Sequence, residues 1–162
     1  MKPLNEEQAY VKASALCSAS EMCPFDVERK LVQWGLPSPV VRRLLERLLD
    51  TGFLNEERYC RAFVHDKLQF NRWGRNKITY SLLSKRLPRE VVNAALAEVD
   101  EEEYVRVLDE LLSSRYRVLM KSALSDYELA RKLYAVAASR GFEGVYVSRW
   151  LASHRLDDCL ED

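Results

Sequence analysis

The residues of this sequence best suited to binding chemistry form a run of cations near its middle. Between Arg61 and Arg89, eight Lys and Arg residues stand against a single acid, Asp66. Such a stretch can bind phosphates or carboxylates, and either contact weakens as salt rises. The candidate partner- or DNA-binding residues are Arg61, Lys67, Arg72, Trp73, Arg75, Lys77, Lys85, Arg86 and Arg89.

Part of this run surrounds an aromatic residue. Arg72, Arg75 and Lys77 cluster about Trp73-Gly74, where we expect a loop to meet the start of a helix. Helix N-termini attract negative charge, so the cluster is a candidate anion-facing site. The alternative is that these cations are solvated and that Trp73 fills a seam between repeated units.

Catalytic and metal-binding patterns are missing from the sequence. It contains no P-loop, G-x-G-x-x-G, H-E-x-x-H or G-x-S-x-G motif, and it has only five glycines. Cys17, Cys23, Cys60 and Cys159 form no C-x-x-C pair, and only two histidines accompany them. We therefore expect no enzyme, no cofactor and no metal site, with the thiols reduced and packed.

Composition favours an all-α protein. The net charge is zero, but acids dominate from Glu98 to Glu110 and again at the C-terminus, so the charge is polarised along the chain. The first residues do not resemble a signal peptide, and no run is apolar enough to span a membrane. We expect a cytoplasmic location and no membrane partner.

Two internal alignments predict a threefold repeat. Asn5, Asn55 and Asp100 each precede two glutamates, as N-caps do, and a tyrosine follows each cap: Tyr10, Tyr59 and Tyr104. Further on, the segments that start at Leu36, Leu87 and Phe142 align without gaps. The expected domains are three three-helix repeats, helix-turn-helix-like, over 1–53, 54–99 and 100–155, followed by an acidic tail over 156–162. Because such small units stack, we expect an elongated, curved array.

The third helix of the first repeat has the clearest local signals. We expect Ser38 to cap it, with Pro39 at the first helical position. Gly52 should end it, and Phe53 should fold back as in a Schellman turn.

The middle repeat resembles the RecX family, regulators of the bacterial recombinase RecA. The segment Gly52–Val64 reads GFLNEERYCRAFV and is followed by RWGRNKI over Arg72–Ile78, then by Leu82. The family pattern is similar: glycine-aromatic-aliphatic-Asn-Asp, Tyr-Ala, Phe-Val, then Gly-x-x-Arg/Lys-Ile-x-x-x-Leu. One departure is Arg86, at a position where the family commonly has glycine. A left-handed turn is costlier without glycine, so a turn of different shape is expected there.

The resemblance implies a function that the residues do not show by themselves. A RecX-like protein would bind the RecA filament on single-stranded DNA as a monomer and inhibit its ATPase and strand exchange. It would thereby modulate recombinational DNA repair and the SOS response, with DNA reached through the filament. Two alternatives stay open: a helix-turn-helix transcriptional regulator, although base-reading side chains are scarce in the third helices, and a helical-repeat adaptor for another partner.

Overall fold

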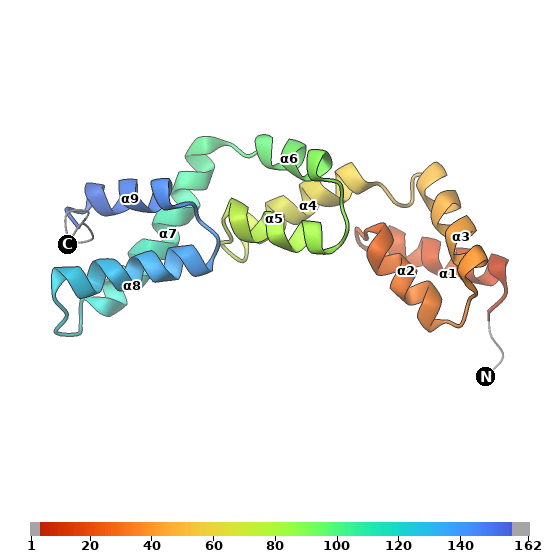
Figure 1. The fold of residues 1–162 in the computed structure, drawn as a ribbon, viewed down its shortest axis with the longest axis horizontal. Coiled ribbons are helices and arrows are strands. Elements are labelled where there is room, and N and C mark those ends of the chain that lie inside the picture. The colour runs from red at the N-terminus through yellow and green to blue at the C-terminus, as the bar shows by residue number, and fades with distance from the viewer. Residues whose placement is uncertain (1–3, 157–162) are drawn as a thin grey trace. The chain divides into compact units, whose positions relative to one another are not determined.

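A computed structural model describes residues 4–156 of the chain, and within them it contains nine α-helices and no strand. This confirms the predicted all-α class. The helices are coloured along the chain in Figure 1. Their bounds are α1 Glu6–Ala19, α2 Pro24–Gln33, α3 Ser38–Asp50, α4 Glu56–Gln69, α5 Arg75–Ser84, α6 Arg89–Ala97, α7 Glu101–Leu119, α8 Asp126–Ser139 and α9 Gly144–Ser153.

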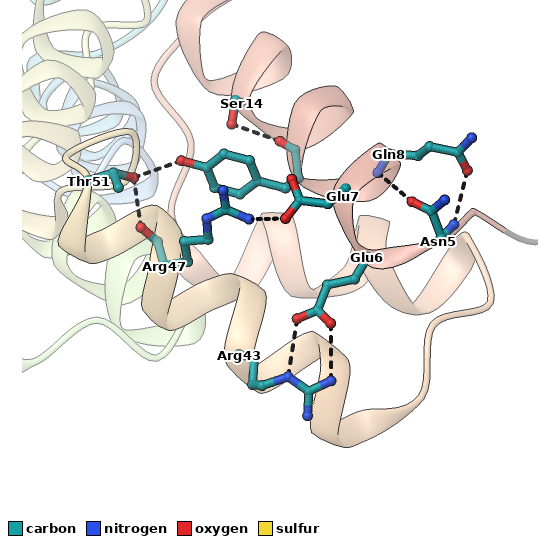
Figure 2. Close-up of polar contacts among 9 residues, drawn as sticks. Asn5, Glu6, Glu7, Gln8, Ser14, Arg43, Arg47 and Thr51 are labelled. Atoms are coloured by element: carbon teal, nitrogen blue, oxygen red, sulfur yellow. Dashed lines mark hydrogen bonds and ion pairs between the residues drawn. The ribbon is translucent and has the colours of Figure 1, made fainter.

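The predicted N-caps of α1, α4 and α7 are confirmed. The Asn5 side chain accepts the backbone N–H of Gln8 at 2.8 Å, and the Gln8 side chain accepts the Asn5 N–H at 3.1 Å (Figure 2). Asn55 and Asp100 likewise accept the backbone N–H three residues on, at 2.8 and 3.1 Å. Each cap satisfies a donor that the helix leaves without a partner, and this fixes where the first helix of each repeat begins.

The turns that end α2, α5 and α8 have one and the same form. The second residue after each helix is left-handed, with φ of 85° at Gly35, 62° at Arg86 and 91° at Gly141. The next residue donates its N–H five residues back, at 3.3, 3.4 and 3.0 Å respectively. The expectation of a different turn at Arg86 is therefore wrong. The Schellman hydrogen bonds hold the arginine in a conformation that costs about 1 kcal/mol more than glycine would.

The ends of α3 differ from the prediction by one residue each. Its N-cap is Pro37, and Ser38 is already the first helical residue and makes no capping hydrogen bond. At the other end Gly52 has φ of 80°, as expected. However, Leu54 rather than Phe53 donates back to the helix, to the Leu48 carbonyl at 3.0 Å, because one extra residue enters the turn.

The chain divides into two compact units, whose boundaries fall inside α4, α5 and α6. Unit 1 contains the chain up to Phe63 together with Leu82–Ala95. In it α1, α2 and α3 pack around buried residues such as Ala9, Leu31 and Leu44. Ion pairs tie α3 to the start of α1, from Arg43 to Glu6 at 3.1 Å and from Arg47 to Glu7 at 2.8 Å (Figure 2).

Unit 2 contains Val64–Ser81 together with the chain from Leu96 onward. In it α7 packs on α8 and α9, with Tyr104, Leu112, Leu133 and Leu151 among the fully buried side chains. Leu156 is also buried, whereas the acidic residues of the predicted tail lie outside the described residues. The repeat boundaries at 54 and 100 remain predictions.

Three of the four cysteines lie in the described part of the chain, and all three are buried free thiols: Cys17, Cys23 and Cys60. Burial raises the pKa of each thiol, which keeps it protonated. Cys159 lies outside the described residues. Among the helices that the structure describes, none is both long and apolar enough to cross a membrane.

Candidate partner-binding surface

The nine predicted contact residues are divided between the two units. Lys67, Arg72, Trp73, Arg75 and Lys77 belong to unit 2, at the end of α4 and the start of α5. Arg61, Lys85, Arg86 and Arg89 belong to unit 1, on α4 and around the turn from α5 to α6.

In unit 2 the turn from α4 to α5 gathers two lysines around Trp73. The Nζ of Lys67 lies 4.9 Å from the ring centroid of the indole, and the Nζ of Lys77 lies 4.6 Å from it. These are cation–π distances, and the indole itself is half-buried. The structure thus brings together three of the predicted residues in one cationic, aromatic cluster.

Backbone hydrogen bonds hold this turn in place. The Trp73 N–H donates to the Lys67 carbonyl at 3.0 Å, and Arg72 takes the left-handed conformation with φ of 53°. Arg140, from the end of α8, donates to the Asn71 carbonyl at 2.7 Å. The Arg72 guanidinium lies 3.8 Å from the carboxylate of Glu110, a loose pair between half-exposed side chains that contributes little to stability.

Arg75 points into unit 2 rather than toward solvent. Its guanidinium pairs with Glu101 at 3.2 Å and with Glu143 at 3.1 Å, and it lies 3.8 Å from the ring centroid of Tyr104. Burial opposes the charge, but hydrogen bonds to Tyr146 and Glu143 outweigh burial and raise the pKa of Arg75. We therefore assign Arg75 to the packing of unit 2 and not to its surface.

The N-terminus of α5 is occupied by groups of the same unit. The Tyr104 hydroxyl accepts the backbone N–H of Arg75 at 3.0 Å, and the Gly141 carbonyl accepts that of Asn76 at 3.0 Å. The Tyr104 hydroxyl in turn donates to Glu143. The anion site expected here is closed, because protein oxygens already use the donors that an anion would need.

Lys85 is also bound within the fold. In unit 1 its Nζ lies 3.1 Å from Asp26 and 3.1 Å from the hydroxyl of the buried Tyr59. Burial opposes the charge, but the bonds to Tyr59 and Asp26 outweigh burial and raise the pKa of Lys85. Arg61, Arg86 and Arg89 are exposed and remain candidate contacts.

Several residues of these networks gave no signal in the sequence. Arg140 adds a cation beside the Trp73 turn, although it lies 69 positions from Asn71, whose carbonyl it binds. Glu143 and Tyr146, which hold Arg75, lie 68 and 71 positions away from it. No local spacing rule connects residues so distant in the chain.

Comparison with known proteins places this architecture among regulatory proteins. The family model of RecX, second three-helix domain, matches residues 55–96, which contain the Trp73 turn. The chain is 27% identical over 147 residues to the regulatory protein RecX of Clostridium perfringens (strain 13 / Type A), covering 88% of this chain and 68% of that protein. It is 29% identical over 143 residues to the regulatory protein RecX of Mycobacterium sp. (strain KMS), covering 87% and 78% respectively.

A solved structure shares the fold. The crystal structure of RecX from Lactobacillus salivarius superposes with a TM-score of 0.81 at 16% identity, covering 93% of this chain and 97% of that chain. The fold and the matched domain define a regulatory protein built of helical repeats. The chain is similar to RecX proteins over most of its length, which confirms the resemblance seen in its middle repeat.

Proposed function

We propose that this protein binds the RecA recombinase filament on single-stranded DNA and inhibits its ATPase and strand exchange. It would act in the cytoplasm as a monomer, by binding rather than catalysis, and so limit recombinational repair in the SOS response. The observation that carries the proposal is the Trp73 cluster, which falls inside the RecX domain matched over 55–96.

The cluster has the chemistry that such a partner requires. Lys67 and Lys77 present positive charge around an aromatic ring, and Arg72 precedes that ring on a turn that backbone hydrogen bonds fix. Cations attract the carboxylates of a protein or the phosphates of DNA, and tryptophan and arginine are enriched among the residues that dominate interfaces. Arg61, Arg86 and Arg89 are proposed as further contacts, while Arg75 and Lys85 support the fold.

The test is inhibition of the cognate recombinase ATPase on single-stranded DNA by the double variant Lys67→Glu/Lys77→Glu. We expect the concentration needed for half inhibition to rise by about tenfold or more, as it does when interface hot spots are lost. Lys12→Glu is the matched control, since Lys12 also lies over a tryptophan, Trp34, at 4.3 Å, but in unit 1.

Each result has a clear meaning. Equal inhibition by the double variant and the wild type would show that the Trp73 cluster is not the contact. No inhibition by the wild type at stoichiometric amounts would reject the function itself. Sequence-specific binding to duplex DNA in the same preparation would then favour the helix-turn-helix regulator.

A further inference from the structure

A hollow lined by α2 and by Arg86 in the turn after α5 has features that the proposed contact at Trp73 does not use. It has a volume of ≈ 330 Å³ and lies wholly in unit 1. Val32 contributes an apolar surface to it, since 59% of this side chain is exposed. The lining residues are Phe25, Glu28, Arg29, Val32, Gln33 and Arg86.

Arg86 lines this hollow with its backbone in the left-handed conformation, which costs free energy in an arginine. The equivalent turns after α2 and α8 have Gly35 and Gly141 in the left-handed position, where glycine is unstrained. The Arg86 side chain is 74% exposed, and its ion pair with Glu28 spans 4.0 Å. Because so exposed a pair contributes little, the Arg86 guanidinium can turn from Glu28 to a partner outside the fold at small cost.

The charges and apolar groups of the hollow specify a partner. The Arg86 guanidinium lies 5.3 Å from the Phe25 ring centroid, and that of Arg29 lies 5.9 Å from it. Of the two acids on α2 near the hollow, Asp26 is bound to Lys85, and Glu28 faces Arg86 across 4.0 Å. Within the described residues, this leaves Arg29 without an acidic partner. The hollow therefore offers two guanidinium groups beside exposed aliphatic and aromatic carbon, which matches a carboxylate next to an apolar side chain.

We propose that this hollow, with Arg29 and Arg86 at its edge and Phe25 and Val32 as its apolar surface, binds an acidic amphipathic segment of the protein subunits in the filament. The inference rests on the proposed function and adds a second contact, made to protein and not to DNA. A nucleic acid backbone would satisfy the arginines but would leave Val32 uncovered, which is why a protein segment fits better.

The experiment compares Arg86→Gly with Arg155→Gly in the intact chain. Both arginines are left-handed, with φ of 62° and 59°, so glycine should relieve strain at either position and raise the Tm by about 2–4 °C. Binding to recombinase filaments on single-stranded DNA should weaken by about tenfold for Arg86→Gly and stay unchanged for Arg155→Gly, which is in unit 2. Val32→Asp should weaken filament binding as well, since it places a carboxylate against the acidic segment.

The outcomes separate the two proposals. If Arg86→Gly and Val32→Asp both bind filaments as tightly as the wild type, the hollow is not a contact. The proposed function would stand in that case. If Arg86→Gly weakens binding to the bare single-stranded oligonucleotide as much as it weakens binding to filaments, the surface binds nucleic acid. That result would overturn the protein contact. A wild type that fails to bind filaments would overturn both.

Discussion

Gly74 and Gly141 show how single residues set the packing of unit 2. A Cβ added to Gly74 would stand 2.5 Å from the Gly141 carbonyl oxygen, and one added to Gly141 would stand 2.4 Å from the Lys77 Cβ. The Gly74 N–H meanwhile donates to the Arg140 carbonyl at 2.7 Å. Only residues without side chains allow the start of α5 to lie this close to the turn after α8.

Gly74→Ala should therefore destabilise the protein by about 2 kcal/mol, because the methyl group would meet backbone that cannot move aside. Gly144→Ala is the control, since its Cβ would meet the Tyr134 hydroxyl at 2.7 Å, the end of a side chain that can rotate. Urea unfolding of both variants measures the difference. Equal midpoints would contradict the close backbone approach.

Arg75 provides a second prediction for a single residue. Replacing it by Met removes the charge that Glu101 and Glu143 share, and it should lower the free energy of unfolding by about 2 kcal/mol. Arg61→Met, at an exposed position of α4, should change stability by less than about 0.5 kcal/mol. If the two variants unfold alike, Arg75 is a surface cation after all.

At the scale of elements, the helix boundaries were the most predictable part of the fold. The caps at Asn5, Asn55 and Asp100 depend on bonds that reach only three residues along the chain, so local spacing identifies them. The turn at Arg86 was mispredicted for a complementary reason. Residue preference favoured glycine there, but the surrounding hydrogen bonds fix the turn whatever residue occupies it.

The helix α3 allows a test of which face is buried. Leu44 is fully buried, whereas Leu49 is 39% exposed on the same helix. Leu44→Ala should lower the free energy of unfolding by about 2–5 kcal/mol. Leu49→Ala should lower it much less, because this truncation removes less buried apolar surface. Thermal unfolding followed by circular dichroism would compare them. A larger loss for Leu49→Ala would contradict the packing of unit 1.

At the scale of the whole molecule, alkaline pH should unfold the chain through groups that burial keeps protonated. Burial raises the pKa of Tyr59 from 10.0 to about 12 and that of Cys60 from 9.0 to about 11. The unfolded chain releases these protons first, so it binds fewer protons than the folded chain above about pH 9. Stability is thus complete below pH 9 and falls as pH rises toward 12.

Urea midpoints measured across this range should decline less steeply in Tyr59→Phe and in Cys60→Ala than in the wild type. Tyr80→Phe is the control, because 77% of the Tyr80 side chain is exposed. An identical slope in all four proteins would show that neither buried group controls alkaline unfolding.

The candidate contact surface was only partly predictable, because charge along the sequence does not reveal which cations the fold uses. Arg75 and Lys85 looked like their neighbours but are bound by Glu143 and Asp26, 68 and 59 positions away. Lys67 and Lys77 are brought to Trp73 by the turn between α4 and α5. Such pairings depend on tertiary packing, which local patterns do not encode.

The closed N-terminus of α5 has a consequence for shortened forms of the protein. A fragment that ends before Asp100 would keep Arg75 but would lose Tyr104, Gly141 and Glu143. Because Val64–Ser81 belong to the same compact unit as the residues that are lost, the turn at Trp73 should lose its fixed shape in such a fragment. The third repeat is therefore needed to shape the contact surface that the second repeat carries.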